Sequence, residues 1–383
     1  MKHVLVLTST FPLKSASHIN PSVRNLVLAL SKKAKVTLLL PDDIALETHY
    51  LNDPNIKIIR FKYFWPRSLQ KLVYGSGIIP NIKANPLLFF EILPFIIFQS
   101  IAIKRVVRTN RVDAVLANWA IPSGLSAALS GLLHSSKLVT YIHGSDANIK
   151  NKAYNAMLRF VVNRSDAVIT VSKPLARKIS SKTNHPNIMV IPQGVNLIRI
   201  RPKQKTRKKH IIFAGRLIKG KGATNLIRAF KIVLSKYSQY TLLVIGDGPQ
   251  RRYLKLYIKR NRIRNVKLLG NVSNAKLTDI LQSSTLLVFP SDLPEGLPNI
   301  LLEAGVCRTP ILTSKVGGVS DLISERYGYF TETDPKQIAN NIDKILSNYK
   351  VATGKSNALF KKIKNSFSTQ KSAAQLLQII NEL

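Results

Sequence analysis

The 383-residue chain contains a single cysteine, Cys307. No internal disulfide can form, and a metal site built from several cysteine thiolates is excluded, so a reducing compartment is the simpler expectation. Acidic residues are also scarce, because 19 Asp and Glu stand against 58 Lys and Arg, a formal net charge of +39. An excess of this size indicates contact with nucleic acid, an anionic membrane surface or phosphate-bearing substrates. A basic bias shared by a whole proteome would give the same count.

Long uninterrupted apolar runs are missing as well. The most apolar stretch, 86–103, is interrupted by Glu91 and Pro94, which makes it a poor transmembrane candidate. The first residues turn polar after a short apolar run and predict a buried strand, not a signal peptide. The 45% hydrophobic content is ordinary for a globular protein and excludes a disordered basic chain.

Short β-rich runs alternate with helical periods in both halves of the chain. Expected strands of the first half are His3–Ser9, Lys35–Leu40, Asp113–Ala117, Leu138–His143 and Ala167–Val171, with a helix at Pro21–Ser31. The series restarts with strands His210–Gly215, Thr241–Ile245, Val266–Leu269, Thr285–Phe289 and Pro310–Thr313, and a helix at Ala223–Leu234. Such alternation predicts parallel sheets with helices on both faces, the α/β doubly wound class.

The restart favours two domains. We predict a first Rossmann-like domain at 1–198, a charged linker at 199–209, a second Rossmann-like domain at 210–371 and a closing amphipathic helix at 372–383. The alternative is that 199–209 is a long solvated loop within one domain. Because doubly wound sheets bind ligands at the carboxyl ends of their strands, a cleft between two such domains is the expected site.

A glycine-rich turn follows the first expected strand of the second half. Residues 215–222, GRLIKGKG, place Arg216 and Lys221 just before an expected helix. Free N–H groups at a helix start, together with two cations, suit a diphosphate. The turn is neither a Walker loop nor a G-x-G-x-x-G fingerprint, so it indicates neither an NTPase nor a dehydrogenase. The alternative is a basic solvated turn.

Two carboxylates lie in 291–305, after the strand expected at Thr285–Phe289. Glu295 falls in a loop, and Glu303 falls about one turn into the helix expected after Pro298. One carboxylate can accept protons from a ribose diol, and another can stabilise positive charge that develops on a sugar ring. The alternative is that Glu295 caps the helix and Glu303 is a surface residue.

Among the seven histidines, His143 has the best placement for chemistry. It ends an expected strand and precedes Gly144 and Asp146. Such a histidine suits general acid or base catalysis or a sugar hydroxyl, although a lone histidine is more often structural.

Together these motifs resemble the retaining glycosyltransferases of family 4, also called group 1, which have two facing Rossmann-like domains with an interdomain cleft, the GT-B fold. The Glu-x7-Glu pair, the Gly-Arg…Lys-Gly loop and the pair Gly317-Gly318 occur in the family's order and spacing. The resemblance covers nearly the whole chain, at 117–148, 165–179, 190–196, 211–230, 242–250, 266–277 and 289–323.

The resemblance implies roles for these residues. Arg216 and Lys221 would hold the donor diphosphate and support the leaving nucleoside diphosphate, and Glu303 would bind ribose hydroxyls. His143 would lie near the transferred sugar, and Asp146 on the acceptor side. Glu295 would hold the donor sugar and α-phosphate with the backbone of Gly296, Leu297, Pro298 and Asn299, while Asn271 and Val272 would contact the base. No metal and no other cofactor is implied, because the basic pair replaces the metal.

Three departures from the family pattern stand out. The first strand-to-helix loop, 11–22, contains no glycine, although many members have a glycine pair there. Arg308 stands where a glycine is usual. Ser320-Asp321 replaces the common Pro-Glu. None of these departures removes Arg216, Lys221, Glu295 or Glu303.

The resemblance implies a hexosyl transferase that uses a nucleotide-sugar donor, retains the anomeric configuration and acts in envelope glycan or glycolipid biosynthesis. The alternatives are a nucleotide-sugar epimerase of the same architecture and a basic nucleic-acid-binding protein. The densest basic tracts contain few aromatics (Tyr253 and Tyr257), which disfavours a specific nucleic-acid partner. An inactive scaffold of the same fold is disfavoured by the intact basic and acidic set.

The segment 58–108 predicts peripheral attachment to the anionic inner face of the cytoplasmic membrane. Basic and aromatic residues alternate before the apolar stretch, and further basic residues follow it, a pattern that suits the headgroup boundary. The residues are Arg60, Phe61, Lys62, Tyr63, Phe64, Trp65, Arg67, Lys71, Tyr74, Lys104, Arg105 and Arg108. A glycan or lipid-linked acceptor would fit this location. The alternative is a buried core helix at 86–103 with aromatics that pack a loop.

Overall fold

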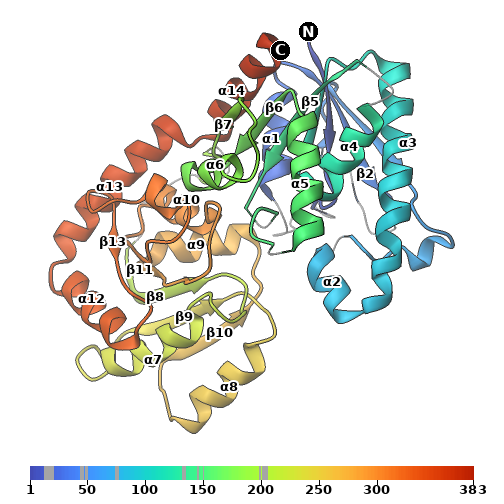
Figure 1. The fold of residues 1–383 in the computed structure, drawn as a ribbon. Coiled ribbons are helices and arrows are strands. Elements are labelled where there is room, and N and C mark those ends of the chain that lie inside the picture. Colours follow the sequence, from blue (N-terminus) through green and yellow to red (C-terminus); the bar gives the residue numbers. More distant parts are fainter. Residues whose placement is uncertain are drawn as a thin grey trace. The chain divides into compact units, whose positions relative to one another are not determined.

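In a computed structural model, the chain forms two compact units. Unit 1 comprises Met1–Gly194 and Thr369–Leu383, and unit 2 comprises Val195–Ser368 (Figure 1). The structure describes residues 1–12, 21–43, 47, 51–73, 77–131, 135–144, 146–149, 151–197, 200 and 206–383. The predicted division at 198 lies four residues beyond the observed one. Most of the predicted linker lies outside the described residues, and its last two residues already belong to a strand.

Unit 1 is built on a seven-stranded parallel sheet of order β3-β2-β1-β4-β5-β6-β7. The central strands are buried over nearly their whole length, as expected of a parallel sheet covered on both faces. The strands are β1 (His3–Leu7), β2 (Lys35–Pro41), β3 (Ile56–Phe61), β4 (Ala114–Asn118), β5 (Lys137–Ile142), β6 (Ala167–Thr170) and β7 (Ile188–Val190).

Helices cover both faces of this sheet, as right-handed crossovers require when the strand order reverses after β3. On one face α1 packs against α14, and on the other α3, α4 and α5 pack in series (Figure 1). Their bounds are α1 (Pro21–Leu30), α2 (Ile78–Ala84), α3 (Ile92–Asn110), α4 (Leu125–Ser130), α5 (Lys152–Arg164), α6 (Lys173–Ser180) and α14 (Thr369–Glu382), with short helical turns η2 (Arg67–Leu69), η3 (Pro86–Glu91) and η4 (Ala120–Gly124).

Unit 2 repeats the design with six parallel strands in the order β10-β9-β8-β11-β12-β13. The strands are β8 (Lys208–Ala214), β9 (Thr241–Ile245), β10 (Val266–Gly270), β11 (Ser284–Phe289), β12 (Ile311–Thr313) and β13 (Tyr329–Phe330). Because the order reverses between β8 and β11, the loops after these two neighbouring strands lie side by side at the switch point.

The helices of unit 2 also form two layers. Helix α7 packs against α12, and α10 packs against both α9 and α13. Their bounds are α7 (Ala223–Val233), α8 (Arg251–Arg260), α9 (Asn274–Ser283), α10 (Asn299–Val306), α11 (Val319–Leu322), α12 (Pro335–Ser347) and α13 (Tyr349–Ser366).

The closing helix belongs to the first unit. Helix α14 starts at Thr369, three residues before the predicted helix, and packs on α1. Its apolar face explains the docking, since Ala373, Leu376 and Ile380 are buried. The chain therefore returns to unit 1 after completing unit 2.

Part of the aromatic segment predicted for the membrane boundary is core. Phe61 and Tyr63 are buried, and the rings of both pack edge-on against Phe95 of α3, with centroids 5.4 and 5.1 Å away. The prediction was wrong for these two residues, because Phe61 at the end of β3 and Tyr63 just after it both pack inward against α3. Trp65 is exposed, and Tyr74 lies outside the described residues.

Candidate active site

Two loops at the switch point of unit 2 are joined by hydrogen bonds. The loop after β8 ends in Gly222, whose φ of 87° precedes α7 and favours glycine. A side chain there would collide with the carbonyl of Pro290 in the loop after β11. The backbone N–H of Asp292 donates to the carbonyl of Gly220 at 2.9 Å. The Gly-Arg…Lys-Gly turn and the loop that leads into the Glu-x7-Glu segment are therefore held against each other.

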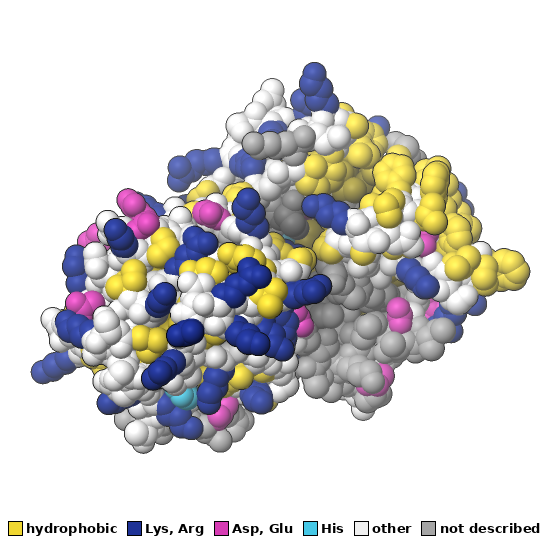
Figure 2. Space-filling view, turned by 90° about the horizontal axis from the view of Figure 1, so that it is seen from below, with side chains coloured by type: hydrophobic (Ala, Val, Ile, Leu, Met, Phe, Trp, Pro, Cys, Tyr) yellow, Lys and Arg dark blue, Asp and Glu magenta, His cyan; other side chains and the backbone are white. Residues whose placement is uncertain are grey.

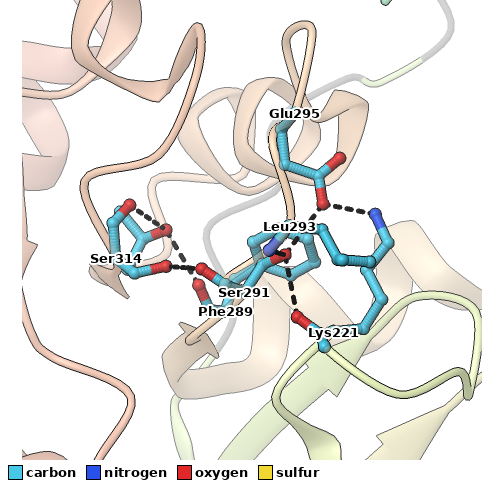
Figure 3. Close-up of polar contacts among 8 residues, drawn as sticks. Lys221, Phe289, Ser291, Leu293, Glu295 and Ser314 are labelled. Carbon is cyan, nitrogen blue, oxygen red and sulfur yellow. Dashed lines mark hydrogen bonds and ion pairs between the residues drawn. The ribbon is translucent and has the colours of Figure 1, made fainter. Parts of the chain in front are cut away.

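Lys221 and Glu295 form an ion pair at this junction (Figure 3). Each side chain is only 14% exposed, so the pair is partly shielded from water. The ammonium group also lies 5.5 Å from the centre of the Phe289 ring, which ends β11. The pair places one positive and one negative group together at the carboxyl ends of β8 and β11.

Buried hydroxyl groups hold Glu295 in place. The hydroxyl of Ser291 donates to Oε1 of Glu295 at 2.9 Å, the same oxygen that contacts Lys221 (Figure 3). Ser314, just after β12, donates its own hydroxyl to the carbonyl of Ser291. The side chain of Glu295 is therefore positioned by groups that follow three adjacent strands.

The backbone of Glu295 is held by the glycine pair. The N–H of Gly318 donates to the carbonyl of Glu295 at 3.0 Å. Gly317 has a φ of 50°, and a side chain there would collide with that same carbonyl. The close approach requires glycine at 317, which gives this motif a positioning role toward Glu295.

Arg216 precedes Lys221 in the loop after β8, and Glu303 follows Glu295 along the chain, on α10. Arg216 is exposed, and among the described residues no carboxylate forms an ion pair with it. Glu303 is partly buried on α10, one turn after Asn299. Burial and the charge of Glu303 raise the pKa of the Cys307 thiol to about 12, so this thiol is not a nucleophile at neutral pH.

The other predicted donor residues flank these groups. Asn271 is exposed and Val272 is partly buried against the core, in the loop after β10. Pro298 is buried at the start of α10, while Gly296, Leu297 and Asn299 are partly buried. Residues 296–299 thus lie at the N-terminus of α10, where N–H groups without intrahelical partners favour an anion.

His143 lies in unit 1, just after β5, with both ring nitrogens occupied. Asn118 donates to the carbonyl of Leu7 at 3.1 Å, which turns its side-chain oxygen toward His143. Nε2 of His143 donates to that oxygen at 3.1 Å, and Nδ1 accepts from the amide of Gln193 at 2.5 Å. Burial lowers the pKa of His143 to about 3, so the imidazole is neutral at physiological pH.

Asp146 is buried and binds backbone. Its two oxygens accept from the N–H of Ala120 at 3.2 Å and of Gly144 at 2.9 Å. Burial raises the pKa of this carboxyl, and the backbone N–H groups oppose that rise. Asp146 therefore ties the loop after β4 to the loop after β5, the loop that also carries His143.

Comparison with known protein families agrees with this arrangement. Residues 196–364 match the family model described as Glycosyl transferases group 1, and residues 20–199 match the model described as Glycosyltransferase Family 4. The chain belongs to the group 1 glycosyltransferases. The two matches together run through both units.

Individual relatives are distant. The chain is 24% identical over 334 residues to an uncharacterized glycosyltransferase of Methanocaldococcus jannaschii, covering 86% of this chain and 91% of the relative. It is 25% identical over 252 residues to the GDP-mannose-dependent monoacylated alpha-(1-6)-phosphatidylinositol monomannoside mannosyltransferase of Corynebacterium glutamicum, covering 60% and 66%.

Solved structures share the fold. The crystal structure of Anabaena Alr3699/HepE in complex with UDP-glucose matches with a TM-score of 0.76 and 17% sequence identity over 100% of both chains. The α/β GT-B prediction is confirmed, with two Rossmann-like domains in this glycosyltransferase.

Four residues that position site side chains of the glycosyltransferase were not predicted from the sequence. Ser291 and Ser314 hold Glu295, and Gln193 and Asn118 hold His143. Ser291 lies in the FPSD segment directly after a strand, a signal that could have singled it out. Gln193 lies fifty positions from His143, and the sequence carries no signal for their contact.

His143 of the glycosyltransferase is expected to stay neutral from pH 8 to pH 5. Its native pKa lies below that of the unfolded chain, so the stability contributed by the neutral imidazole is present above about pH 6.5 and declines as the pH falls toward 3. NMR titration of the ring resonance, assigned as the signal missing in His143→Gln, should show no midpoint in this range. A midpoint near 6.5 would contradict the assigned environment.

Proposed function

We propose that this glycosyltransferase moves a hexosyl group from a nucleoside-diphosphate sugar to a glycan or lipid-linked acceptor, with retention of the anomeric configuration. The observation that carries the proposal is the shielded Lys221–Glu295 pair just before α7, together with Arg216 in the same loop, a cation with no ion-pair partner among the described residues. A diphosphate and a sugar are the two groups that such a mixed set of charges suits. The UDP-glucose bound by the structural relative and the GDP-mannose used by the sequence relative are donors of this class.

The diphosphate would bind at the loop after β8. When the glycosidic bond breaks, negative charge grows on the departing diphosphate, and Arg216 and Lys221 would stabilise that charge. The free N–H groups at the start of α7 would add to the same field. To bind, the diphosphate competes with Glu295 for Lys221, and this exchange frees Glu295 to accept hydrogen bonds from the donor sugar.

The remaining donor contacts follow from the same placement. Glu303 would accept the ribose hydroxyl protons, and the loop at Asn271 and Val272 would contact the base. The backbone at 296–299 would hold the α-phosphate at the start of α10. In unit 1, neutral His143 would exchange its hydrogen bond with Gln193 for one with the transferred sugar and would transfer no proton. Asp146 would shape the acceptor-side loop through its two backbone bonds.

No metal is required in this proposal, since the cations of Arg216 and Lys221 supply the positive charge that a divalent ion would otherwise bring. Among the described residues, no three His, Cys, Asp or Glu side chains lie close enough together to hold a metal ion. The donor carries the reactive group, and no other cofactor is needed.

A donor screen tests the function. Purified protein is heated with nucleotide sugars, and a true donor at 100 times its Kd should add about 2.7 kcal/mol to the free energy of unfolding. The donor found is then supplied with membrane or glycan acceptors, and NMR of the product should show the anomeric configuration of the donor. Inversion would refute retention, and conversion of the donor without an acceptor would indicate an epimerase.

The same transfer assay is run with EDTA, and its rate should stay within twofold of the untreated rate. Activity that EDTA abolishes and magnesium or manganese restores would refute the metal-free site.

A further inference from the structure

The face of unit 1 that carries η3 and α3 displays large hydrophobic side chains to solvent. Phe90 is 72% exposed, Leu87 71% and Leu93 64%. We name this set the apolar ridge, which consists of Leu87, Phe89, Phe90, Leu93, Ile97, Phe98 and Ile101. Figure 2 shows the hydrophobic side chains gathered on this part of unit 1. Seven neighbouring exposed side chains of this size mark an interaction surface.

The ridge is not an unfinished part of the domain core. Helix α3 already buries its opposite face, including Phe95, Ile96 and Ile103, against unit 1. The segment from Pro86 to Asn110 is long and apolar enough to cross a membrane by composition. Because its inner face packs against α4 and β3, it lies along the domain and cannot span a bilayer without leaving the core.

The exposed stripe of α3 changes from apolar to basic along its length. Phe90, Leu93, Ile97 and Ile101 recur at three- and four-residue intervals, so they share one helix face. The same spacing continues to Arg105 and Arg108, which are exposed at the end of the helix. An apolar stripe that ends in arginines matches an acyl boundary beside phosphate headgroups.

The chain segment that forms this surface contains very little negative charge. Glu91 is the one acidic residue between positions 56 and 111 of the sequence. It is buried, and its Oε2 accepts from the backbone N–H groups of Lys71 and Leu72 at 3.1 Å each. Lys62, Lys71 and Lys83 are exposed on the segments around the ridge.

We propose that the apolar ridge docks this enzyme on the surface of a bilayer that contains anionic lipids. The ridge dips below the headgroups, and Arg105 and Arg108 bind lipid phosphates. A second copy of the chain is a poorer occupant, because it would bring the same basic stripe against itself in a protein of net charge +39. The inference concerns where the enzyme works, and it stands on surface residues that take no part in the proposed donor site.

Flotation of the full-length protein with vesicles tests the docking. We expect it to float with vesicles of phosphatidylcholine and phosphatidylglycerol at low salt, and less with phosphatidylcholine alone or at high salt. The triple variant Phe89→Ser, Phe90→Ser and Leu93→Ser should reduce the floated fraction about tenfold or more. If the triple variant does not fold, the single variant Phe90→Ser replaces it, and a reduced floated fraction in that variant supports the docking.

Matched variants separate the two components of docking. Leu256→Ser and Val351→Ser change side chains of unit 2 that are each 46% exposed, and they should float like the parent protein. Arg105→Gln with Arg108→Gln should weaken flotation and flatten its salt dependence. Arg216→Ala should float normally, which distinguishes a failure of docking from a failure of the donor site.

Three outcomes would overturn the proposal. The first is a parent protein that stays unbound with anionic vesicles at low salt. The second is concentration-dependent dimerisation that the ridge variant abolishes, because the ridge would then be covered by a second copy. The third is resistance to extraction from membranes by high salt and alkaline carbonate, because the segment would then span the bilayer.

Discussion

Arg216→Ala and Lys221→Ala are each expected to lower kcat more than tenfold, a loss of at least about 1.4 kcal/mol of transition-state stabilisation. A departing diphosphate gains charge as its bond to the sugar breaks, and both cations lie at the loop where we place it. Their effects on stability should differ. Arg216 is exposed and has no ion-pair partner among the described residues, so its loss should leave the fold unchanged.

Lys221→Ala has a second consequence. It leaves the partly shielded carboxylate of Glu295 without its cation, which should lower the free energy of unfolding by on the order of 1–3 kcal/mol. Circular dichroism at the assay temperature therefore has to accompany the kinetics.

Lys219→Ala is the matched control for both variants. It removes one positive charge from the same loop, at an exposed position. Since we assign it no phosphate contact, its kcat should stay within twofold of the parent value. Near-normal turnover in both Arg216→Ala and Lys221→Ala would refute the assigned phosphate site, whatever Lys219→Ala does.

The central strands of each sheet could be predicted because they are buried and read as continuous apolar runs. Two short strands at the sheet edges could not. Strand β13 has two residues and β7 has three, too few for any periodicity. Strand β3 was interpreted as part of a membrane segment because it lies at the sheet edge, where Lys57 and Arg60 face solvent or an ion-pair partner.

Arg308 illustrates a departure that only the structure explains. It has a φ of 53° just after α10, a conformation that favours glycine. Its guanidinium lies 4.5 Å over the ring of Phe360 on α13, a cation–π contact that offsets part of the backbone cost. Nothing in the local sequence links position 308 to position 360.

The sequence predicted the charged residues of the candidate site but not the contacts between them. Spacing alone placed Lys221 and Glu295 after two strands, and their strands proved to be neighbours. The ion pair between them depends on side-chain directions, on Ser291 in the same loop as Glu295, and on Ser314 in the loop after β12. The position of His143 depends in the same way on Gln193, and the burial that lowers its pKa depends on packing that the local sequence does not show.

Glu295→Ala should lower kcat about a hundredfold, whereas Glu303→Ala should mainly raise the KM for the donor. The reason lies in when each contact is made. A ribose contact at Glu303 is the same in the ground and transition states, so its loss weakens binding without changing turnover. We place Glu295 next to the sugar on which positive charge develops, so its contact strengthens as the reaction proceeds.

A double-mutant cycle tests whether Lys221 and Glu295 act as one unit. Because they form an ion pair, the variant that carries both Lys221→Ala and Glu295→Ala should be clearly less impaired than the product of the two single effects. Its stability should also recover relative to Lys221→Ala, since no carboxylate is left unpaired. Steady-state kinetics and urea unfolding of the four proteins measure both. Multiplicative losses of kcat would mean that the two groups act independently, and a higher KM in Glu295→Ala with lower turnover in Glu303→Ala would reverse our placement of the donor.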